Sequence, residues 1–336
     1  MYNPSEVGKK GSIFGLPYSI EEAALALISV NLDATVSYGV GTASAPGLIL
    51  NESAQLDLSL IDVEDPWSLK IAMEGRLVSK DKNSIHRGRA KNVIEALEAG
   101  KTSDAKEIDY VNEFCKSIHQ LVEVESTTFL NQGKLVGVVG GDHSSPLGLL
   151  RALAKRFTFG ILQIDAHMDL RKAYEGFTYS HASIMFNALE LEEVSSLTQV
   201  GIRDFCEEET NFIARSEKNI DVFFDEILFK EKMNGKSWDR ICDEIVDTLP
   251  DNVYVSFDMD GLDPSLCPNT GTPVPGGLSF NEASFLLEKL TKSGRTIIGF
   301  DVCETGKSTF DANVAARILY RLSVYAGISN GLLRFR

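Results

Sequence analysis

The side chains best suited to chemistry lie in an alternating run, Asp165-Ala166-His167-Met168-Asp169, which directly follows the apolar segment Phe159–Ile164. In an extended chain, residues two apart point to the same side, so Asp165, His167 and Asp169 are expected to project together. Three such groups at a buried strand end would repel one another and lose solvation unless a cation lay among them. The run therefore predicts a metal site, and the alternative is an exposed strand end without a ligand.

A second alternating run has the same form and follows the apolar residues 253–255. Its Asp258 and Asp260 also lie two apart, so both carboxylates should project from one side of the chain. Asp263 precedes Pro264, and we expect it to hold a turn or to support a ligand rather than to bind metal directly. This run is the second predicted source of metal ligands.

A third segment, Gly140-Gly141-Asp142-His143-Ser144, begins where the apolar run Leu135–Val139 ends. A lone histidine in such a loop is more often a capping or packing residue, so His143 is a weak candidate on its own. However, the stretch 143–181 holds three of the five histidines in the chain. The three segments offer six candidate ligands: His143, Asp165, His167, Asp169, Asp258 and Asp260.

Six ligands are too many for one ion that must keep an open position, so we expect two ions that share bridging carboxylates. Oxygen-rich ligation without thiolate favours Mn²⁺, with iron, cobalt or nickel as alternatives. The four carboxylates would neutralise two divalent ions, and a water shared by both ions would be a hydroxide at neutral pH. A cationic guanidinium group would be attracted to such a centre.

A parallel sheet is the element best able to bring these segments together. Apolar runs of strand length alternate with segments of helical period along much of the chain. The expected strands are 134–140, 157–165, 197–201, 222–225, 253–258 and 296–302, and the expected helices are 145–155, 181–190, 205–217, 237–249, 281–291 and 313–325. Strands that are apolar on both faces, each followed by a helix, predict a three-layer αβα sandwich with a mostly parallel central sheet. Such sheets place their sites at the carboxyl ends of the strands.

Residues 1–336 are expected to form a single domain, because no repeat, low-complexity tract or Pro/Ser-rich linker divides the sequence. Within it, residues 1–88 are less regular and are expected to wrap the domain edge. The length and the 43% of hydrophobic residues are sufficient for a large core.

Charge and cysteine content exclude several classes of protein. A net charge of −15 argues against nucleic acid binding, which needs a basic surface. The acidity would suit a cationic ligand, although it is also a common solubility device. No signal peptide or membrane-spanning run is recognisable, and five scattered cysteines fit reduced thiols, so we expect a cytoplasmic protein without a membrane partner.

The three motifs read Gly-Gly-Asp-His-Ser, Asp-Ala-His-x-Asp and Ser-x-Asp-x-Asp-x-x-Asp-Pro, and in this order the sequence resembles the ureohydrolase family of arginase, agmatinase and formimidoylglutamase. The resemblance is strong from Gly140 to the C-terminus, and residues 38–46 are similar to the N-terminal segment of the family. It implies an arginase-like fold, two divalent ions with Mn²⁺ favoured and Ni²⁺ as the alternative, a small cationic guanidino substrate, and a homo-trimer or homo-hexamer.

The resemblance also assigns ligands. One metal would be held by His143, Asp165, Asp169 and Asp258, and the other by Asp165, His167, Asp258 and Asp260, so that Asp165 and Asp258 bridge the two ions. Asp142 and Asp263 would support these ligands from neighbouring positions.

Catalytic and substrate-binding roles follow from the same resemblance. His181, in Tyr179-Ser180-His181, matches the mobile histidine that protonates the leaving amine in the family. Glu304 matches the glutamate that hydrogen-bonds the guanidinium group. The expected catalytic residues are therefore His181, Glu304 and Asp169. Arg171 and Glu175 are the expected substrate-binding positions, and Arg171 is similar to formimidoylglutamases, whose substrates end in carboxylates.

These assignments predict an agmatinase-like hydrolase that converts agmatine and water to putrescine and urea. Free guanidine, or another small guanidino or formimino compound, is the alternative substrate. Two proteins of other classes could carry similar motifs: a two-metal phosphoesterase, and a metal-binding protein without catalytic activity on the same fold.

Overall fold

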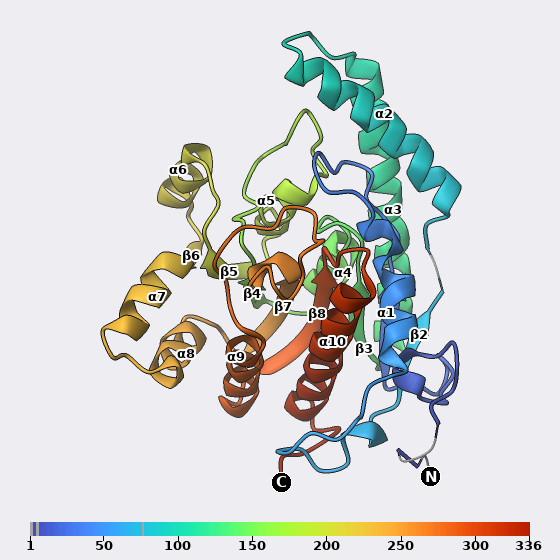
Figure 1. Cartoon of the computed structure of the whole chain (residues 1–336), viewed down its shortest axis with the longest axis vertical. Coiled ribbons are helices and arrows are strands. Elements are labelled where there is room, and N and C mark those ends of the chain that lie inside the picture. Colours follow the sequence, from blue (N-terminus) through green and yellow to red (C-terminus); the bar gives the residue numbers. More distant parts are fainter. Residues whose placement is uncertain (1–2, 5–6, 76) are drawn as a thin grey trace.

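The computed structural model describes residues 3–4, 7–75 and 77–336. Its centre is a sheet of eight strands in the order β2-β1-β3-β8-β7-β4-β5-β6, and neighbouring strands pair in parallel. The strands are β1 (Leu25–Ser29), β2 (Ile71–Glu74), β3 (Leu135–Val139), β4 (Phe159–Ile164), β5 (Val194–Ile202), β6 (Asn219–Phe224), β7 (Asn252–Asp258) and β8 (Thr296–Cys303). Figure 1 shows the sheet in the middle of the molecule, between helices.

Helices on both faces of the sheet complete three layers. Along β4, Phe159 and Ile161 belong to one apolar core, whereas Leu162 and Ile164 belong to a second core on the opposite face. This alternation follows from the two-residue period of a strand. The first core is covered by α3 (Ala105–Asn131), α4 (Leu147–Ala154) and α5 (Ile184–Leu189), and the second by α1 (Ala45–Ser53), α8 (Trp238–Asp247), α9 (Phe280–Lys292) and α10 (Thr309–Ser329). The predicted three-layer sandwich is confirmed.

Most boundaries of the expected elements shift by only a few residues. The expected helix 181–190 begins as a single 3₁₀ turn, His181–Ser183, before α5 starts. Between β5 and α8 lie α6 (Glu207–Arg215), which was expected, and α7 (Asp225–Met233), which was not. α7 is missed by hydrophobic periodicity because Leu228 is its only buried residue.

The first 131 residues contain more regular structure than the sequence pattern indicated. β1 and β2 extend the sheet beyond β3. Next come α2 (Lys80–Glu98) and α3, which pack against each other and together form the α2–α3 arm, residues 80–131. Figure 1 shows α2 reaching past the edge of the central layers. Periodicity misses α2 because its buried residues are few: Asn83, Ala90, Val93 and Ile94.

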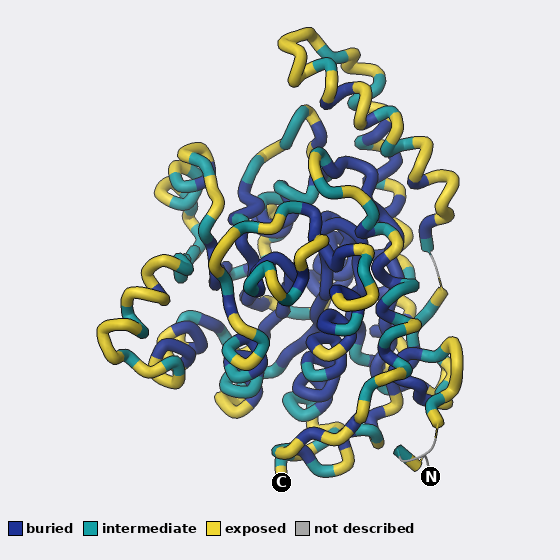
Figure 2. The backbone as a smooth tube through the Cα atoms, in the orientation of Figure 1, coloured by how far each residue is buried: buried dark blue, intermediate teal, exposed yellow. Residues whose placement is uncertain are grey.

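Burial is concentrated on the sheet. Figure 2 shows buried backbone in the central strands and exposed backbone on the outer turns of the helices. Within the described residues, no helix is both long enough and apolar enough to cross a bilayer. The four central strands, β3, β8, β7 and β4, are neighbours, so the loops after them start at one edge of the sheet.

Candidate metal centre and active site

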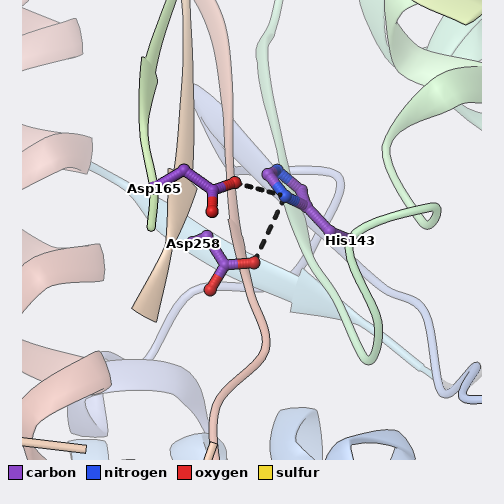
Figure 3. Close-up of side chains that lie close together, drawn as sticks. All are labelled: His143, Asp165 and Asp258. Carbon is purple, nitrogen blue, oxygen red and sulfur yellow. Dashed lines mark ion pairs between the residues drawn. The ribbon is translucent and has the colours of Figure 1, made fainter. Parts of the chain in front are cut away.

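His143 forms the focus of a buried carboxylate cluster at this edge. Its Nδ1 lies 3.0 Å from Asp165 Oδ2, 3.0 Å from Asp169 Oδ2 and 3.2 Å from Asp258 Oδ2. Figure 3 shows the carboxylates of Asp165 and Asp258 on the same side of the imidazole, both pointing toward it. Burial lowers the pKa of His143, but the three carboxylates outweigh burial and raise this pKa well above its ordinary value. The cluster therefore favours a positive charge at its centre.

A relay of side chains orients the His143 ring. Nε2 lies 2.8 Å from Ser256 Oγ, which donates to Asp301 Oδ2 at 2.9 Å, and Tyr254 also donates to Asp301 Oδ2 at 2.8 Å. With its hydroxyl proton given to Asp301, Ser256 accepts the Nε2 proton of His143. With Nε2 held in this way, Nδ1 faces the carboxylates and would offer its lone pair to a cation that takes the place of its proton, as a metal ligand requires.

Breaking this relay is expected to weaken metal binding. We predict that Ser256→Ala lowers metal affinity roughly ten- to a hundred-fold, because His143 loses the acceptor that fixes its orientation. Competition of the variant with a chelator of known affinity measures the change. Thr198→Ala is a control. Thr198 of β5 is also buried, but its hydroxyl bonds Thr248 at the C-terminal end of α8 rather than a residue of the relay. Equal metal affinity of Ser256→Ala and the wild type would contradict the relay.

A second group of donors lies beside the first. His167 Nδ1 is 3.1 Å from Asp260 Oδ2 and 3.7 Å from Asp165 Oδ1. The donor atoms of His143, Asp165 and Asp258 lie within 4.8 Å of one another, and so do those of Asp165, His167 and Asp260. Asp165 belongs to both groups, as a bridging carboxylate would.

The donor set fits two divalent cations. Burial and the charge of Asp165 raise the pKa of Asp169 to about 7, and burial with the charges of Asp260 and Asp165 raises the pKa of Asp258 well above its ordinary value. His143 Nδ1 has no hydrogen-bond partner among the described residues, although the three carboxylate oxygens surround it. Buried carboxylates that face a common point with a free imidazole nitrogen are what bound cations would stabilise.

The structure brings all six predicted ligands together. Asp258 lies beside His143 through Oδ2, while its Oδ1 accepts the backbone N–H of Asp260 at 2.8 Å. The role of Asp258 as a second bridging carboxylate stays a prediction. Asp169 has a left-handed backbone, with φ +56°, which is unfavourable for a residue other than glycine. Strain of this kind gathers at functional sites, which agrees with a ligand role for Asp169.

A pocket of about 150 Å³ opens beside His167 and Asp169. Its lining includes two of the predicted ligands, His167 and Asp169, together with His181 and Arg171. The remaining lining residues are Ser37, Tyr174, Ala182, Asp204, Phe205, Glu209 and Thr272. The cluster is therefore open to a small molecule.

His181 lines the pocket and is partly buried. Burial, together with the positive charges of His167 and His143, lowers the pKa of His181 to about 4. Its Nδ1 is 3.4 Å from Ser180 Oγ, and its ring centre is 6.0 Å from that of Tyr174. A neutral imidazole at this position can accept a proton and return it.

Glu304 reaches the same cluster from the end of β8. Its Oε1 accepts the backbone N–H of His143 at 3.0 Å, while Oε2 is buried without a hydrogen-bond partner among the described residues. Burial and the charge of Asp142 raise the pKa of Glu304 well above its ordinary value. A Cβ built on Gly271 would lie 3.0 Å from Oε2, so this glycine leaves space beside the carboxylate. A buried, unpaired carboxylate oxygen suits a cationic partner.

The other predicted positions lie around this centre. Arg171 lines the pocket and places its guanidinium 4.9 Å from the Tyr174 ring centre, whereas Glu175, in the next turn of that loop, is not among the lining residues. Asp142 is buried and accepts from Ser144 N and Oγ, at 3.0 and 2.6 Å. Asp263 accepts from Ser265 N at 2.9 Å, which is the turn role expected for it.

Several supporting residues were missed by sequence reasoning. Asp301 and Tyr254 belong to the His143 relay, and the Arg203 guanidinium donates to the backbone oxygens of Gly201, Asp260, Leu262 and Val274. These bonds hold the Asp260 loop against the strand end at Gly201. A signal existed only for Asp301, which is an acidic residue inside an apolar strand run.

Comparison with known proteins agrees with this geometry. The Arginase family model matches residues 23–324. The N(1)-aminopropylagmatine ureohydrolase of Synechocystis is 30% identical over 318 residues, which cover 93% of this chain and 92% of that protein. The agmatinase of Pyrococcus horikoshii is 29% identical over 316 residues, which cover 90% and 91%.

Solved structures show the same architecture. The agmatine ureohydrolase of Thermoplasma volcanium matches with a TM-score of 0.72 and 25% identity, over 96% of each chain. The proclavaminate amidino hydrolase of Streptomyces clavuligerus matches in fold, with a TM-score of 0.74 and 20% identity over 96% of this chain and 99% of that chain. With a family model that covers most of its length and relatives matched over nearly their full length, the chain belongs to the arginase family of ureohydrolases.

Proposed function

We propose that this ureohydrolase cleaves the guanidino group of a substrate that carries an amine at its other end, with agmatine, giving putrescine and urea, as the first choice. N(1)-aminopropylagmatine is a longer substrate of the same class. The names of the similar proteins from Synechocystis and Pyrococcus horikoshii support this class. The observation that carries the proposal is a pair of ligand groups joined at Asp165, with the carboxylate of Glu304 bonded to the backbone of one of the ligands, His143.

Each residue near the cluster has a role in this proposal. The ligand groups would hold two divalent cations, which supply Lewis acidity and lower the pKa of water. Glu304 Oε2 would accept N–H bonds from the guanidinium and orient its carbon. His181 would carry a proton to the leaving amine, because its imidazole lines the pocket and can accept and return a proton.

Replacement of His181 with alanine is expected to slow turnover without removing metal. General acid or base catalysis contributes roughly 10²-fold or more, so we predict a loss of kcat of about 10²-fold. Urea release by the metal-loaded variant measures this loss, and elemental analysis measures the metal. Ser180→Ala serves as a control, because it changes the neighbouring hydroxyl and keeps the imidazole. Unchanged kcat would exclude His181 as the proton carrier.

A substrate panel tests the proposed class. Urea or ammonia release is measured for protein loaded separately with Mn²⁺ and Ni²⁺, with agmatine, N(1)-aminopropylagmatine, guanidine, arginine, guanidinobutyrate and formiminoglutamate as substrates. The highest kcat/KM is expected for an amine-bearing guanidino compound. If the fully metal-loaded protein releases neither urea nor ammonia from any compound of the panel, the proposal is overturned and a non-catalytic metal-binding role is favoured.

Arg171 gives reason for a second candidate. Its guanidinium at the pocket repels a distal ammonium and attracts a carboxylate, so an acid-ended substrate such as guanidinobutyrate or formiminoglutamate is the alternative. Asp204 lines the same pocket and has the opposite charge, which favours the amine-bearing class. The ratio of kcat/KM for agmatine and guanidinobutyrate decides between them.

The metal, the oligomeric state and the cellular compartment are part of the same proposal. Mn²⁺ is our first choice for both sites and Ni²⁺ the alternative, because the donors are carboxylates and imidazoles without thiolate. We also propose a homo-trimer or homo-hexamer in the cytoplasm. All five cysteines lie in the described part of the chain and are unpaired, as a reducing compartment would require.

A further inference from the structure

The loop between β4 and the 3₁₀ turn at His181 forms one wall of the pocket. Arg171, Tyr174 and His181 all line the pocket from this loop. At its tip, Tyr174 and Phe177 exchange two backbone hydrogen bonds, of 3.1 and 2.8 Å, across Glu175 and Gly176. Both central residues have positive φ, +54° and +87°, as in the tight turns that join paired strands. The wall is thus a short hairpin, and Tyr174 lies on the side of the hairpin that precedes its turn.

The tip of this hairpin is held by α3, more than sixty positions earlier in the chain. The Asn112 side-chain amide donates to Gly176 O at 3.3 Å, and its oxygen accepts the Thr178 N–H at 3.0 Å. Ile108, one helical turn before Asn112, lies where a Cβ on Gly176 would meet its Cδ1 at 2.7 Å. Both ends of one amide therefore hold backbone on either side of Phe177.

The other helix of the arm holds a second wall of the pocket, which contains Ser37. Ser37 lines the pocket within the segment that follows Asp33. Asp33 is buried and accepts from Gly41 N at 3.0 Å, from Asn83 Nδ2 at 2.6 Å and from Arg87 Nη1 at 3.4 Å. Asn83 and Arg87 belong to α2, so this helix fixes the start and end of the Ser37 segment.

The two helices of the arm are joined to each other. Arg89 Nη1 of α2 lies 2.9 Å from both carboxylate oxygens of Glu107 of α3, and the His86 ring stacks on Phe114 with a centroid distance of 3.6 Å. The arm thus connects both walls of the pocket through contacts that involve none of the six metal ligands. This arrangement separates the shape of the pocket from the construction of the metal centre.

We propose that the α2–α3 arm braces the two walls of the pocket and that Asn112 is a positioning residue for Tyr174 and, through the same loop, for His181. The inference rests on the proposed function for its kinetic readout only. Asn112 acts on substrate binding through the loop, because Arg171 N also bonds Ala182 O at 3.2 Å and so ties the two ends of the loop together.

A graded series of variants tests the brace. Asn112→Leu has a similar size and removes both hydrogen bonds, whereas Asn112→Asp keeps the acceptor for Thr178 N–H and loses the donor to Gly176 O. Loss of both bonds is expected to lower kcat/KM roughly ten-fold, mainly by raising KM, and the aspartate variant should fall between. Glu113→Leu is the matched control, since its partner Lys116 lies on α3 itself.

Two further measurements separate a positioning role from a general loss of stability. Metal content should stay at the wild-type value, and amide hydrogen exchange should accelerate in residues 171–182 of Asn112→Leu but not in the sheet. A kcat/KM within two-fold of the wild type, loss of metal, or exchange that rises throughout the chain would each overturn the proposal. If the wild-type protein hydrolyses no compound in the panel, the proposed function fails, while the exchange measurement still decides whether Asn112 braces the loop.

Discussion

Replacement of Asp165 or Asp258 with alanine is expected to abolish both metal binding and turnover. Asp165 contributes to both donor groups, and Asp258 completes the group around His143. Without either carboxylate, one or both cations lose a ligand that also neutralises their charge, and a water molecule in its place would supply no compensating charge. Elemental analysis and urea release measure the two effects on the same sample.

The Asp258 variant should remain folded, which makes its result interpretable. Burial and the neighbouring Asp260 and Asp165 charges disfavour the charged form of Asp258, so alanine removes a repelling group from the core. Asp263→Ala is the matched control. Asp263 lies in the same loop, and its side chain accepts a hydrogen bond from Ser265 N within its own turn. Two metal ions per chain in Asp165→Ala or Asp258→Ala would refute the ligand assignment.

Glu304→Gln is expected to lower kcat/KM by roughly 10³-fold while metal content stays constant. The amide oxygen can still accept the His143 N–H, but an NH₂ group replaces the free carboxylate oxygen that would face the guanidinium. Removing one partner of a buried charge pair costs about 2–5 kcal/mol, and about 4 kcal/mol corresponds to this loss of activity.

A second substitution distinguishes charge from geometry at this position. Glu304→Asp keeps the negative charge but shortens its reach by one methylene, so it should retain more activity than Glu304→Gln if charge dominates. Saturation kinetics with agmatine, or with the best substrate of the panel, measure both variants. Activity of Glu304→Gln close to that of the wild type would show that the guanidinium binds elsewhere.

Local alternation was sufficient to predict strands β3 to β8 and most of the candidate ligands at their ends. Apolar runs that end in Asp-x-His-x-Asp or Asp-x-Asp specify both the strand and the side from which its terminal side chains project. The structure confirms that these segments meet, because the strands before them, β3, β4 and β7, lie close together in a parallel sheet. Glu304 and His181 were found only through resemblance, since a single acidic residue or histidine carries little pattern.

The His143 relay could not be predicted, because it depends on strand order. Ser256 and Asp301 lie 45 positions apart and pair directly in the register of β7 with β8. Only the insertion of β8 between β3 and β7 brings Asp301 under His143, and hydrophobic pattern does not define strand order. The same applies to Asn112, whose partners at Gly176 and Thr178 become neighbours only in the folded chain.

The position of β8 also bears on how the sheet is completed when the chain folds. It is the last strand of the sheet to be synthesised, yet it lies near the middle, with β2-β1-β3 on one side and β7-β4-β5-β6 on the other. Before β8 is in place, β3 and β7 would each present an open edge, and open strand edges are prone to wrong pairing. The strand that closes these two edges also carries Asp301 and leads directly into Glu304, so closure of the sheet and completion of the candidate centre depend on the same segment.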